Sequence, residues 1–339
     1  MKNYNISVMK DSKKQIFQSI EELVGNTPMM ELTKYEKENA CYAHILGKLE
    51  WYNPTGSIKD RAALNMILSA KKEGILHKGD TIVEQTSGNT GIALAAFANR
   101  LGYRMEIFLE RGASLERREF LEAYGVRLLD YKDAIGLRNN KDHEWIEPDR
   151  EATLKEIEEY CHKNHSYFIN QVINKHNPEA HVLTTGPEIW SQTDGKIDYL
   201  VCMAGTGGTL SGLGKYLKDK NPDLKIILAQ PDADSCLTHK DCSKPIIDGV
   251  LPIFEVDERE LTDFQNKDLC DGYVNVATED AYEVARKLAK SDGLLIGTSS
   301  AASLLVATQI AQKRENEGKN IVVIMPDNGT KYLSTKMFE

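Results

Sequence analysis

The stretch Asn53-Pro54-Thr55-Gly56-Ser57-Ile58-Lys59-Asp60-Arg61 decides how the rest of the chain is interpreted. It follows an apolar run, residues 43–51, that predicts a strand, and it leads into residues 60–73, where apolar side chains recur at helical spacing. Proline, glycine and serine are typical of the turn between them, so we expect Lys59 near the helix start. The positive end of the helix dipole lowers the pKa of an ammonium there, and a neutral lysine attacks carbonyl compounds. A solvated surface lysine stays open as the alternative.

The composition is that of an ordinary globular protein, because the 339 residues are 41% hydrophobic and 27% charged. This length favours two domains. A formal net charge of -9 argues against a nucleic-acid partner or an anionic membrane surface. Residues 1–15 carry lysines but no apolar stretch, so we expect neither a signal peptide nor a membrane span. A cytoplasmic location is the expected consequence.

The cysteines are scattered through the sequence without a CxxC pair. Cys236 and Cys242 are the closest, and His239 lies between them. Zinc sites normally show two such tight pairs, so we expect no metal and interpret the cysteines as reduced structural thiols.

Strand and helix patterns alternate along the chain, which predicts mainly parallel sheets covered by helices. The expected strands are residues 43–51, 81–85, 104–109, 127–130, 166–171, 199–203, 225–230, 272–276 and 320–325. The expected helices are residues 60–73, 88–101, 115–124, 151–162, 179–192, 209–220, 278–291 and 301–317. Residues 131–150 and 232–270 break the rhythm. We therefore expect an α/β fold of two three-layer αβα domains, with the active site in the cleft between them.

Two strand-to-helix loops have the chemistry of anion sites. Gly205-Thr206-Gly207-Gly208-Thr209 can direct backbone N–H groups, a helix dipole and hydroxyls at a phosphate, although a purely structural glycine turn would look the same. Its spacing is neither that of a Walker A loop nor GxGxxG. Thr86-Ser87-Gly88-Asn89-Thr90-Gly91 suits a carboxylate, or else a helix cap around Ser87 and Thr90.

A third turn, Gly297-Thr298-Ser299-Ser300, precedes a helix and taken alone is only an N-cap. Turns of this kind gather at the carboxyl edge of a parallel sheet, where ligands bind. A lysine, a phosphate loop, a carboxylate loop and a hydroxyl site together match one cofactor, pyridoxal 5'-phosphate (PLP).

The ordered motifs NPTGSIKDRAA, EQTSGNTGIALA, TTGPEIW, AGTGGTLSG and GTKYLST resemble those of the cysteine synthase and cystathionine β-synthase family, which are fold type II PLP enzymes. The resemblance covers residues 20–335. It implies a large PLP-binding domain, residues 1–52 and 165–339, and a small mobile domain, residues 53–164. It also implies a homodimer.

The resemblance further implies roles for individual residues. Lys59 would form the Schiff base with PLP, Asn89 would bond the ring hydroxyl and Ser299 would meet the pyridine nitrogen. The residues implied to hold the phosphate are Gly205, Thr206, Gly207, Gly208 and Thr209. Those implied to bind the substrate carboxylate are Thr86, Ser87, Asn89, Thr90 and Gln171.

These assignments favour chemistry at Cβ. Ser299 is a neutral partner for the pyridine, so the carbanion is less delocalised into the ring, which disfavours transamination. Lys59, released as a free amine when the substrate replaces it on PLP, is placed to remove the Cα proton. The expected product of that step is an α-aminoacrylate, which a nucleophile then attacks or water hydrolyses.

Two stretches depart from the family pattern, as do Ser300-Ala301 and Asp327 near the expected pyridine site, where Ser-Gly and Ser are usual. Where cysteine synthases carry a GIGAGF-like loop, this chain has Asp248-Gly249-Val250-Leu251-Pro252-Ile253-Phe254, and it has Gln230-Pro231-Asp232 after the strand 225–230. A carboxylate at residue 232 could take a proton from water and direct the water at the aminoacrylate, whereas it would repel bisulfide. Alternatively, Asp232 caps a turn and faces solvent.

The sequence therefore predicts a hydrogen-sulfide-producing cysteine (hydroxyl) lyase, a PLP-dependent enzyme that forms L-serine from L-cysteine and water. The main alternative is an O-acetylserine sulfhydrylase, that is, a cysteine synthase. A non-catalytic binding protein on the same fold is the alternative of another class, and it would lack the visible absorption of bound PLP.

Overall fold

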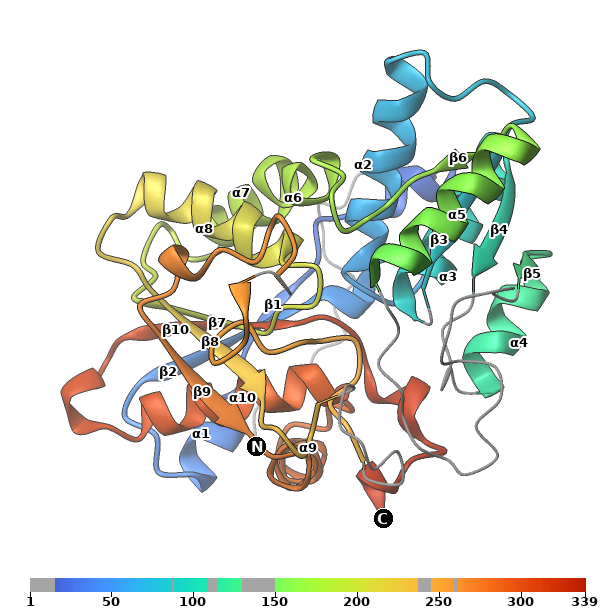
Figure 1. The fold of residues 1–339 in the computed structure, drawn as a ribbon. Coiled ribbons are helices and arrows are strands. Elements are labelled where there is room, and N and C mark those ends of the chain that lie inside the picture. Colours follow the sequence, from blue (N-terminus) through green and yellow to red (C-terminus); the bar gives the residue numbers. More distant parts are fainter. Residues whose placement is uncertain (1–15, 87, 109–114, 130–149, 237–244, 259–260) are drawn as a thin grey trace.

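The computed structural model describes residues 16–86, 88–108, 115–129, 150–236, 245–258 and 261–339. They form two sheets (Figure 1), one of six strands in the order β1-β2-β10-β7-β8-β9 and one of four in the order β5-β4-β3-β6. Strand β1 pairs antiparallel with β2, and the other pairings in both sheets are parallel. The predicted mainly parallel α/β fold is therefore confirmed.

The strands are β1 Met29–Glu31, β2 His44–Leu49, β3 Thr81–Gln85, β4 Arg104–Phe108, β5 Arg127–Leu129, β6 Tyr167–Phe168, β7 Tyr199–Cys202, β8 Lys225–Pro231, β9 Gly272–Val276 and β10 Asn320–Met325. The helices are α1 Thr33–Glu38, α2 Lys59–Lys72, α3 Asn89–Leu101, α4 Leu115–Ala123, α5 Arg150–Asn164, α6 His176–Ala180, α7 Gly186–Gln192, α8 Gly208–Lys220, α9 Thr278–Ser291 and α10 Thr298–Ala311. Among the described residues, no helix is both long enough and apolar enough to cross a membrane.

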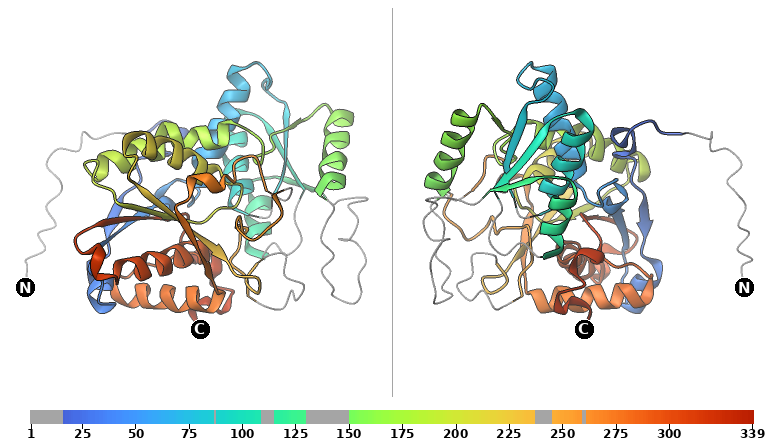
Figure 2. Two further views of the ribbon diagram at one scale, coloured as in Figure 1. Left: turned by 60° about the vertical axis from the view of Figure 1, so that its left-hand side comes forward. Right: turned by 90° about the vertical axis from the view of Figure 1, so that its right-hand side faces the viewer.

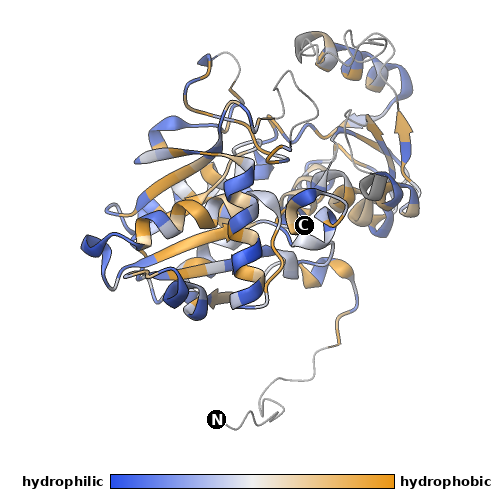
Figure 3. Ribbon diagram, turned by 90° about the horizontal axis from the view of Figure 1, so that it is seen from below, coloured by the Kyte–Doolittle hydropathy of each residue, from blue (hydrophilic) through white to orange (hydrophobic). Residues whose placement is uncertain are grey.

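The six-stranded sheet is covered on both faces, with α6, α7 and α8 on one side and α9 and α10 on the other (Figures 1 and 2). Successive residues of a strand face opposite sides. Along β10, Ile321 and Val323 accordingly pack with α9 and α10, while Val322 and Ile324 pack with α7 and α8. This explains why the strand is apolar throughout, and Figure 3 shows hydrophobic residues running along the strands.

The four-stranded sheet has the same three-layer construction. Ile82 and Ile107 pack in a core with α2 and α3. Val83 and Phe108, their neighbours on the same strands, pack instead with Ile157 of α5.

One strand lies on the other side of the expected domain boundary. The family resemblance implied that residues from 165 onward belong to the large domain, but β6 pairs with β3, with Tyr167 opposite Ile82 and Phe168 opposite Val83. The four-stranded sheet is therefore completed by a strand beyond residue 164. Residues 131–149, expected to be a loop, and His239 and Cys242 lie outside the described residues.

Two expected helices have different limits. The helix expected over 179–192 is divided by a π-helical turn, His181–Thr185, after which α7 begins at Gly186. Pro187 has no N–H for the carbonyl four residues earlier, so a regular α-helix cannot continue through it. The helix expected over 301–317 spans Thr298–Ala311, and near its end the Asn316 side chain donates to the Ile310 carbonyl.

Candidate active site

Lys59 is the first residue of α2, as the turn motif predicted. Gly56 adopts φ 81°, a conformation that glycine favours, and the Thr55 N–H donates to the Asp60 carboxylate at 2.7 Å. Burial lowers the pKa of Lys59, and the nearby Asp327 carboxylate acts in the opposite direction. The loss of solvation favours the neutral, nucleophilic amine.

Asp327, which follows β10, is where several parts of the site converge. Its backbone pairs with Ser57 in an antiparallel bridge, next to Lys59. The Gly297 N–H donates to its carbonyl at 3.2 Å, and Asn89 Nδ2 donates to its carboxylate at 2.8 Å. The Lys59 loop, the start of α3 and the start of α10 are therefore joined through one buried aspartate.

Ser299 was expected just before the helix but lies in the first turn of α10, because this helix begins at Thr298 instead of residue 301, and only 6% of Ser299 is exposed. Gly297 is the N-cap residue. The adjacent Ser300 hydroxyl donates to the Asp327 carbonyl at 3.2 Å. This bond ties the beginning of α10 to the residue that also contacts Asn89.

The loop of residues 205–209 joins β7 to α8, and its glycines leave no room for side chains. A Cβ on Gly205 would lie 2.4 Å from the carbonyl oxygen of Gly249, and one on Gly207 would lie 2.4 Å from that of Phe264. Gly207 is the N-cap of α8, with φ 83°. The first N–H groups of a helix lack intrahelical acceptors, and with the helix dipole they suit a phosphate.

A buried histidine lies beside this loop. His181 contacts the Thr185 hydroxyl through Nδ1 at 2.9 Å and the Thr209 hydroxyl through Nε2 at 3.3 Å. Burial, with the charges of Arg61 and Lys59, lowers the pKa of His181 to about 3, so the ring is neutral. A neutral ring has one donor and one acceptor, and the tautomer protonated at Nε2 leaves the Thr209 hydroxyl proton for an anion.

The predicted carboxylate loop lies at the start of α3. The Thr86 hydroxyl accepts from Gly88 N–H at 3.2 Å, and the Thr90 hydroxyl donates to Gln171 Oε1 at 2.8 Å. Thr90 and Gln171, expected to bind the same carboxylate, are thus in contact. Ser87 lies outside the described residues.

Asn177 connects the carboxylate loop to the phosphate loop. Its Nδ2 donates to the Gln171 carbonyl at 2.8 Å and to the Thr206 hydroxyl at 3.0 Å. A Cβ on Gly208 would lie 2.2 Å from Asn177 Oδ1, so this side chain also fills the space that the glycine leaves. The two anion loops consequently belong to one site.

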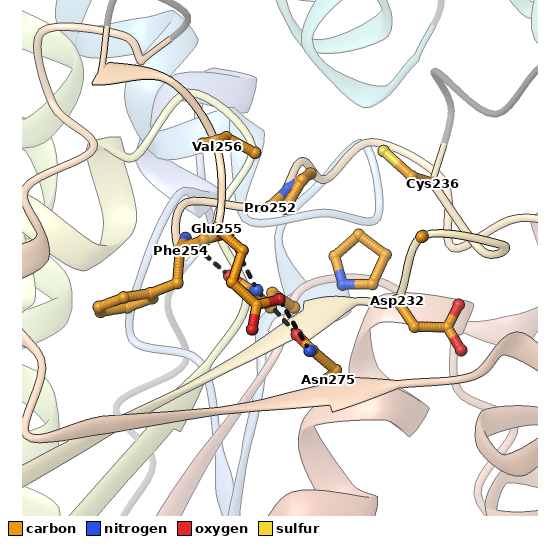
Figure 4. A pocket seen from close by; sticks show the side chains of 10 residues that line it. Asp232, Cys236, Pro252, Phe254, Glu255, Val256 and Asn275 are labelled. Atoms are coloured by element: carbon orange, nitrogen blue, oxygen red, sulfur yellow. Dashed lines mark hydrogen bonds between the residues drawn. The ribbon is translucent and has the colours of Figure 1, made fainter.

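The two stretches that depart from the family pattern are hydrogen-bonded to each other (Figure 4). Gln230 Oε1 accepts the N–H groups of Ile253 and Phe254 at 3.1 and 3.0 Å, and Gln230 Nε2 donates to Asn275 Oδ1 at 2.8 Å. The Leu251 N–H donates to the Ala204 carbonyl at 2.9 Å, immediately before the phosphate loop. The unusual loop therefore packs on the predicted cofactor site.

Asp232 borders a pocket of about 430 Å³ that Pro252 and Phe254 also line. Its Oδ1 accepts the Ser235 N–H at 2.8 Å, so the cap that the sequence left open is present. Figure 4 shows its carboxylate turned away from Asn275. Asp232 remains partly exposed, and the cap fixes the orientation of its side chain.

The donor set fits PLP. A buried amine with a lowered pKa suits the aldehyde, the first turn of α8 suits the phosphate, and the Asn89 amide and the Ser299 hydroxyl are neutral groups for the ring. The glycines of residues 205–208 leave the cradle for the phosphate clear of side chains.

Comparison with known proteins agrees with this geometry. The family described as "Pyridoxal-phosphate dependent enzyme" matches residues 20–327. The chain therefore belongs to the PLP-dependent enzymes of fold type II, in the family of the cysteine synthases. PLP is its cofactor.

Particular relatives show how far the likeness extends. A cysteine synthase of Staphylococcus aureus is 38% identical over 325 residues, which are 94% of this chain and 96% of that protein. The structure of an Entamoeba histolytica cysteine synthase is 33% identical with a TM-score of 0.82, over 97% of this chain and 93% of that one. A hydrogen sulfide-producing enzyme from Fusobacterium nucleatum is 32% identical with a TM-score of 0.80, over 94% and 100%.

Sequence reasoning missed Asn177, His181 and Lys331, and it noted Asp327 only as a departure from the family pattern. The first two stand just before the TTGPEIW motif, and the last two stand next to or within the terminal GTKYLST motif. Their positions beside quoted motifs were the available signal, but their partners lie far away in the sequence.

Proposed function

We propose that the protein converts L-cysteine and water into L-serine and hydrogen sulfide. Bound PLP supplies an electron sink that makes the Cα proton acidic and lets the Cβ substituent leave. The side chains of Thr86, Thr90 and Gln171, with the backbone N–H of Asn89 in the first turn of α3, hold the substrate carboxylate next to this centre. Their contacts around the start of α3 support that role.

The protein groups then handle the protons. Neutral Lys59 removes the Cα proton, the Cβ–S bond breaks and bisulfide leaves. Asp232 takes a proton from water as the water oxygen bonds to Cβ, Lys59 returns its proton to Cα, and the water-derived proton converts bisulfide into hydrogen sulfide. Atoms and charge balance without an oxidant or reductant.

The observation that carries this proposal is the fixed carboxylate of Asp232 at the carboxyl end of β8. Its Oδ1 accepts the Ser235 N–H, and it follows the strand next to β7, whose carboxyl end leads into the phosphate loop. A negative charge in this position favours water over bisulfide as the nucleophile. The similarity to a hydrogen sulfide-producing enzyme from Fusobacterium nucleatum supports the same direction.

Cysteine synthase activity is the second candidate, because the 38% identical relative from Staphylococcus aureus carries that name. If this candidate is right, the purified protein should form cysteine efficiently from O-acetylserine and sulfide. The homodimer implied by the family resemblance and the cytoplasmic location expected from the sequence are parts of the same proposal. Light scattering of the homodimer would give twice the monomer mass.

The test compares Asp232→Asn with wild type. Asparagine can still accept the Ser235 N–H, so the turn is retained while the proton acceptor is lost. We expect sulfide and serine release from L-cysteine to fall about 100-fold or more, the typical contribution of a general base. Asp234→Asn removes the same charge from an exposed neighbour and should remain active.

Product analysis in ¹⁸O-labelled water completes the test. Labelled serine is expected from the wild type. Pyruvate and ammonia as main products, or cysteine synthesis unaffected by Asp232→Asn, would contradict the hydration reaction.

A further inference from the structure

The amide of Asn89 is held between two charged groups from the segment that follows β10. Asn89 Nδ2 donates to Asp327 Oδ2 at 2.8 Å, and Lys331 Nζ donates to Asn89 Oδ1 at 2.7 Å. Asn89 is the first residue of α3, whereas Asp327 and Lys331 are more than two hundred residues further along the chain. The contact therefore joins the two α/β units.

The chemistry of the two partners determines which way the amide points. A carboxylate only accepts hydrogen bonds and an ammonium only donates them. The reverse orientation would place the amide N–H₂ against Lys331 and the amide oxygen against Asp327, so neither bond could form. Of the two hydrogens on Asn89 Nδ2, Asp327 takes one, which leaves the second for another acceptor.

The two charged groups are themselves held in place. The Asp327 carboxylate also accepts the Tyr332 hydroxyl at 3.0 Å, and a Cβ on Gly297 would lie 2.0 Å from Asp327 Oδ1. Lys331 Nζ also donates to the carbonyls of Thr55 and Gly56, each at 3.4 Å. Since these carbonyls belong to the loop that carries Lys59, one ammonium links the Lys59 loop to Asn89.

We propose that Asp327 and Lys331 are positioning residues that clamp the Asn89 amide and direct its second N–H at the ring oxygen of PLP. The inference rests on the proposed role of Asn89 as partner of that oxygen. Without the clamp the amide rotates freely, so the cofactor loses a preorganised donor. Hydrogen bonds that involve charged groups are the strong ones, which makes the loss measurable.

The test measures PLP binding and absorption instead of turnover. Its outcome therefore does not depend on whether the protein catalyses the cysteine reaction. Lys331→Met is compared with Lys331→Arg, which keeps the charge, and with Lys336→Met, the same change at an exposed residue. The readouts are the dissociation constant of PLP from the apoprotein and the visible absorption maximum of the holoenzyme. Asp327→Asn tests the other partner.

We expect Lys331→Met and Asp327→Asn to weaken PLP binding about tenfold or more and to shift the visible maximum. Lys331→Arg should recover most of the affinity, and Lys336→Met should match the wild type. A dissociation constant and spectrum unchanged in Lys331→Met would overturn the proposal.

A double-mutant cycle separates the clamp from a general effect on folding. In an Asn89→Ala background the clamp has nothing to orient, so Lys331→Met should cause little further loss of PLP affinity. If Lys331→Met weakens binding equally in both backgrounds, the residue acts by another route and the proposal is wrong.

Discussion

At the scale of single residues, His181 gives the site a predictable sensitivity to acid. Burial lowers the pKa of His181 from 6.5 to about 3, so between these values the unfolded chain binds a proton that the folded protein does not. The contribution of the neutral His181 ring to the unfolding free energy is complete above pH 6.5 and is lost as the pH falls towards 3. The window corresponds to a loss on the order of 5 kcal/mol of unfolding free energy.

His181→Gln should remove that part of the pH dependence. Urea unfolding of the holoenzyme between pH 4.5 and 8 checks this, with the difference between the wild-type and variant curves as the readout. His77→Gln, which changes a side chain that is 76% exposed, serves as the control. Parallel curves for wild type and His181→Gln would contradict a buried neutral imidazole.

The site residues differ in how far the sequence predicted them. Lys59 was expected because it follows a proline and glycine turn, and its position at the start of α2 is set by neighbours in the chain. Asp327 was noticed only as a departure from the family pattern, because its contacts with Asn89 and Ser57 form only when the chain folds. Asp232 shows a third case, in which the sequence offered a proton acceptor and a turn cap as alternatives, and the hydrogen bond from the Ser235 N–H forms the cap.

At the scale of elements, the loop before α8 tests whether backbone shape alone can hold the phosphate. Gly207→Ala would place a Cβ 2.4 Å from the Phe264 carbonyl, so the loop must move and carry its N–H groups with it. We expect PLP affinity to fall at least about tenfold, which corresponds to about 1.4 kcal/mol. Equilibrium dialysis of PLP with the apoprotein measures this.

Gly293→Ala is the matched control for that substitution. Gly293 also has a positive φ, 73°, but no atom lies within 4 Å of an added Cβ. Both variants carry the backbone strain, about 1–2 kcal/mol, and only Gly207→Ala carries the collision. Equal PLP affinities in the two variants would show that the loop adapts and that its glycines are structural.

Most elements could be predicted because their periodicity is local. Strands β3, β9 and β10 and helix α9 have the limits that the sequence indicated. The π-helical turn at His181–Thr185 was missed, since the apolar spacing continues through it and only Pro187 signals the break. That break matters for the site, because it lies where His181 reaches Thr209.

At the scale of the whole molecule, a buried charge network joins the two α/β units behind Lys59. Arg61 Nε donates to Glu50 at 2.7 Å, Arg61 also bonds Glu188 at 2.7 Å, and Lys48 bonds Glu188 at 2.8 Å. Burial alone would raise the pKa of Glu188, but the bonds from Arg61 and Lys48 outweigh it and lower the pKa to about 2. The network connects β2, α2 and α7, which the sequence could not bring together because sheet order and helix packing are properties of the complete fold.

Arg61→Met should therefore destabilise the protein far more than a surface change. It leaves the buried Glu50 carboxylate without its cation, which costs about 3–5 kcal/mol of unfolding free energy. Lys287→Met, which breaks the exposed pair with Glu283, should cost less than about 1 kcal/mol. Urea unfolding with saturating PLP compares the two. Adding Glu50→Gln to Arg61→Met should recover part of the lost unfolding free energy, because the unpaired charge is then gone. A loss below about 1 kcal/mol in Arg61→Met alone would mean that water reaches Glu50. The two units would then not be held together by this network.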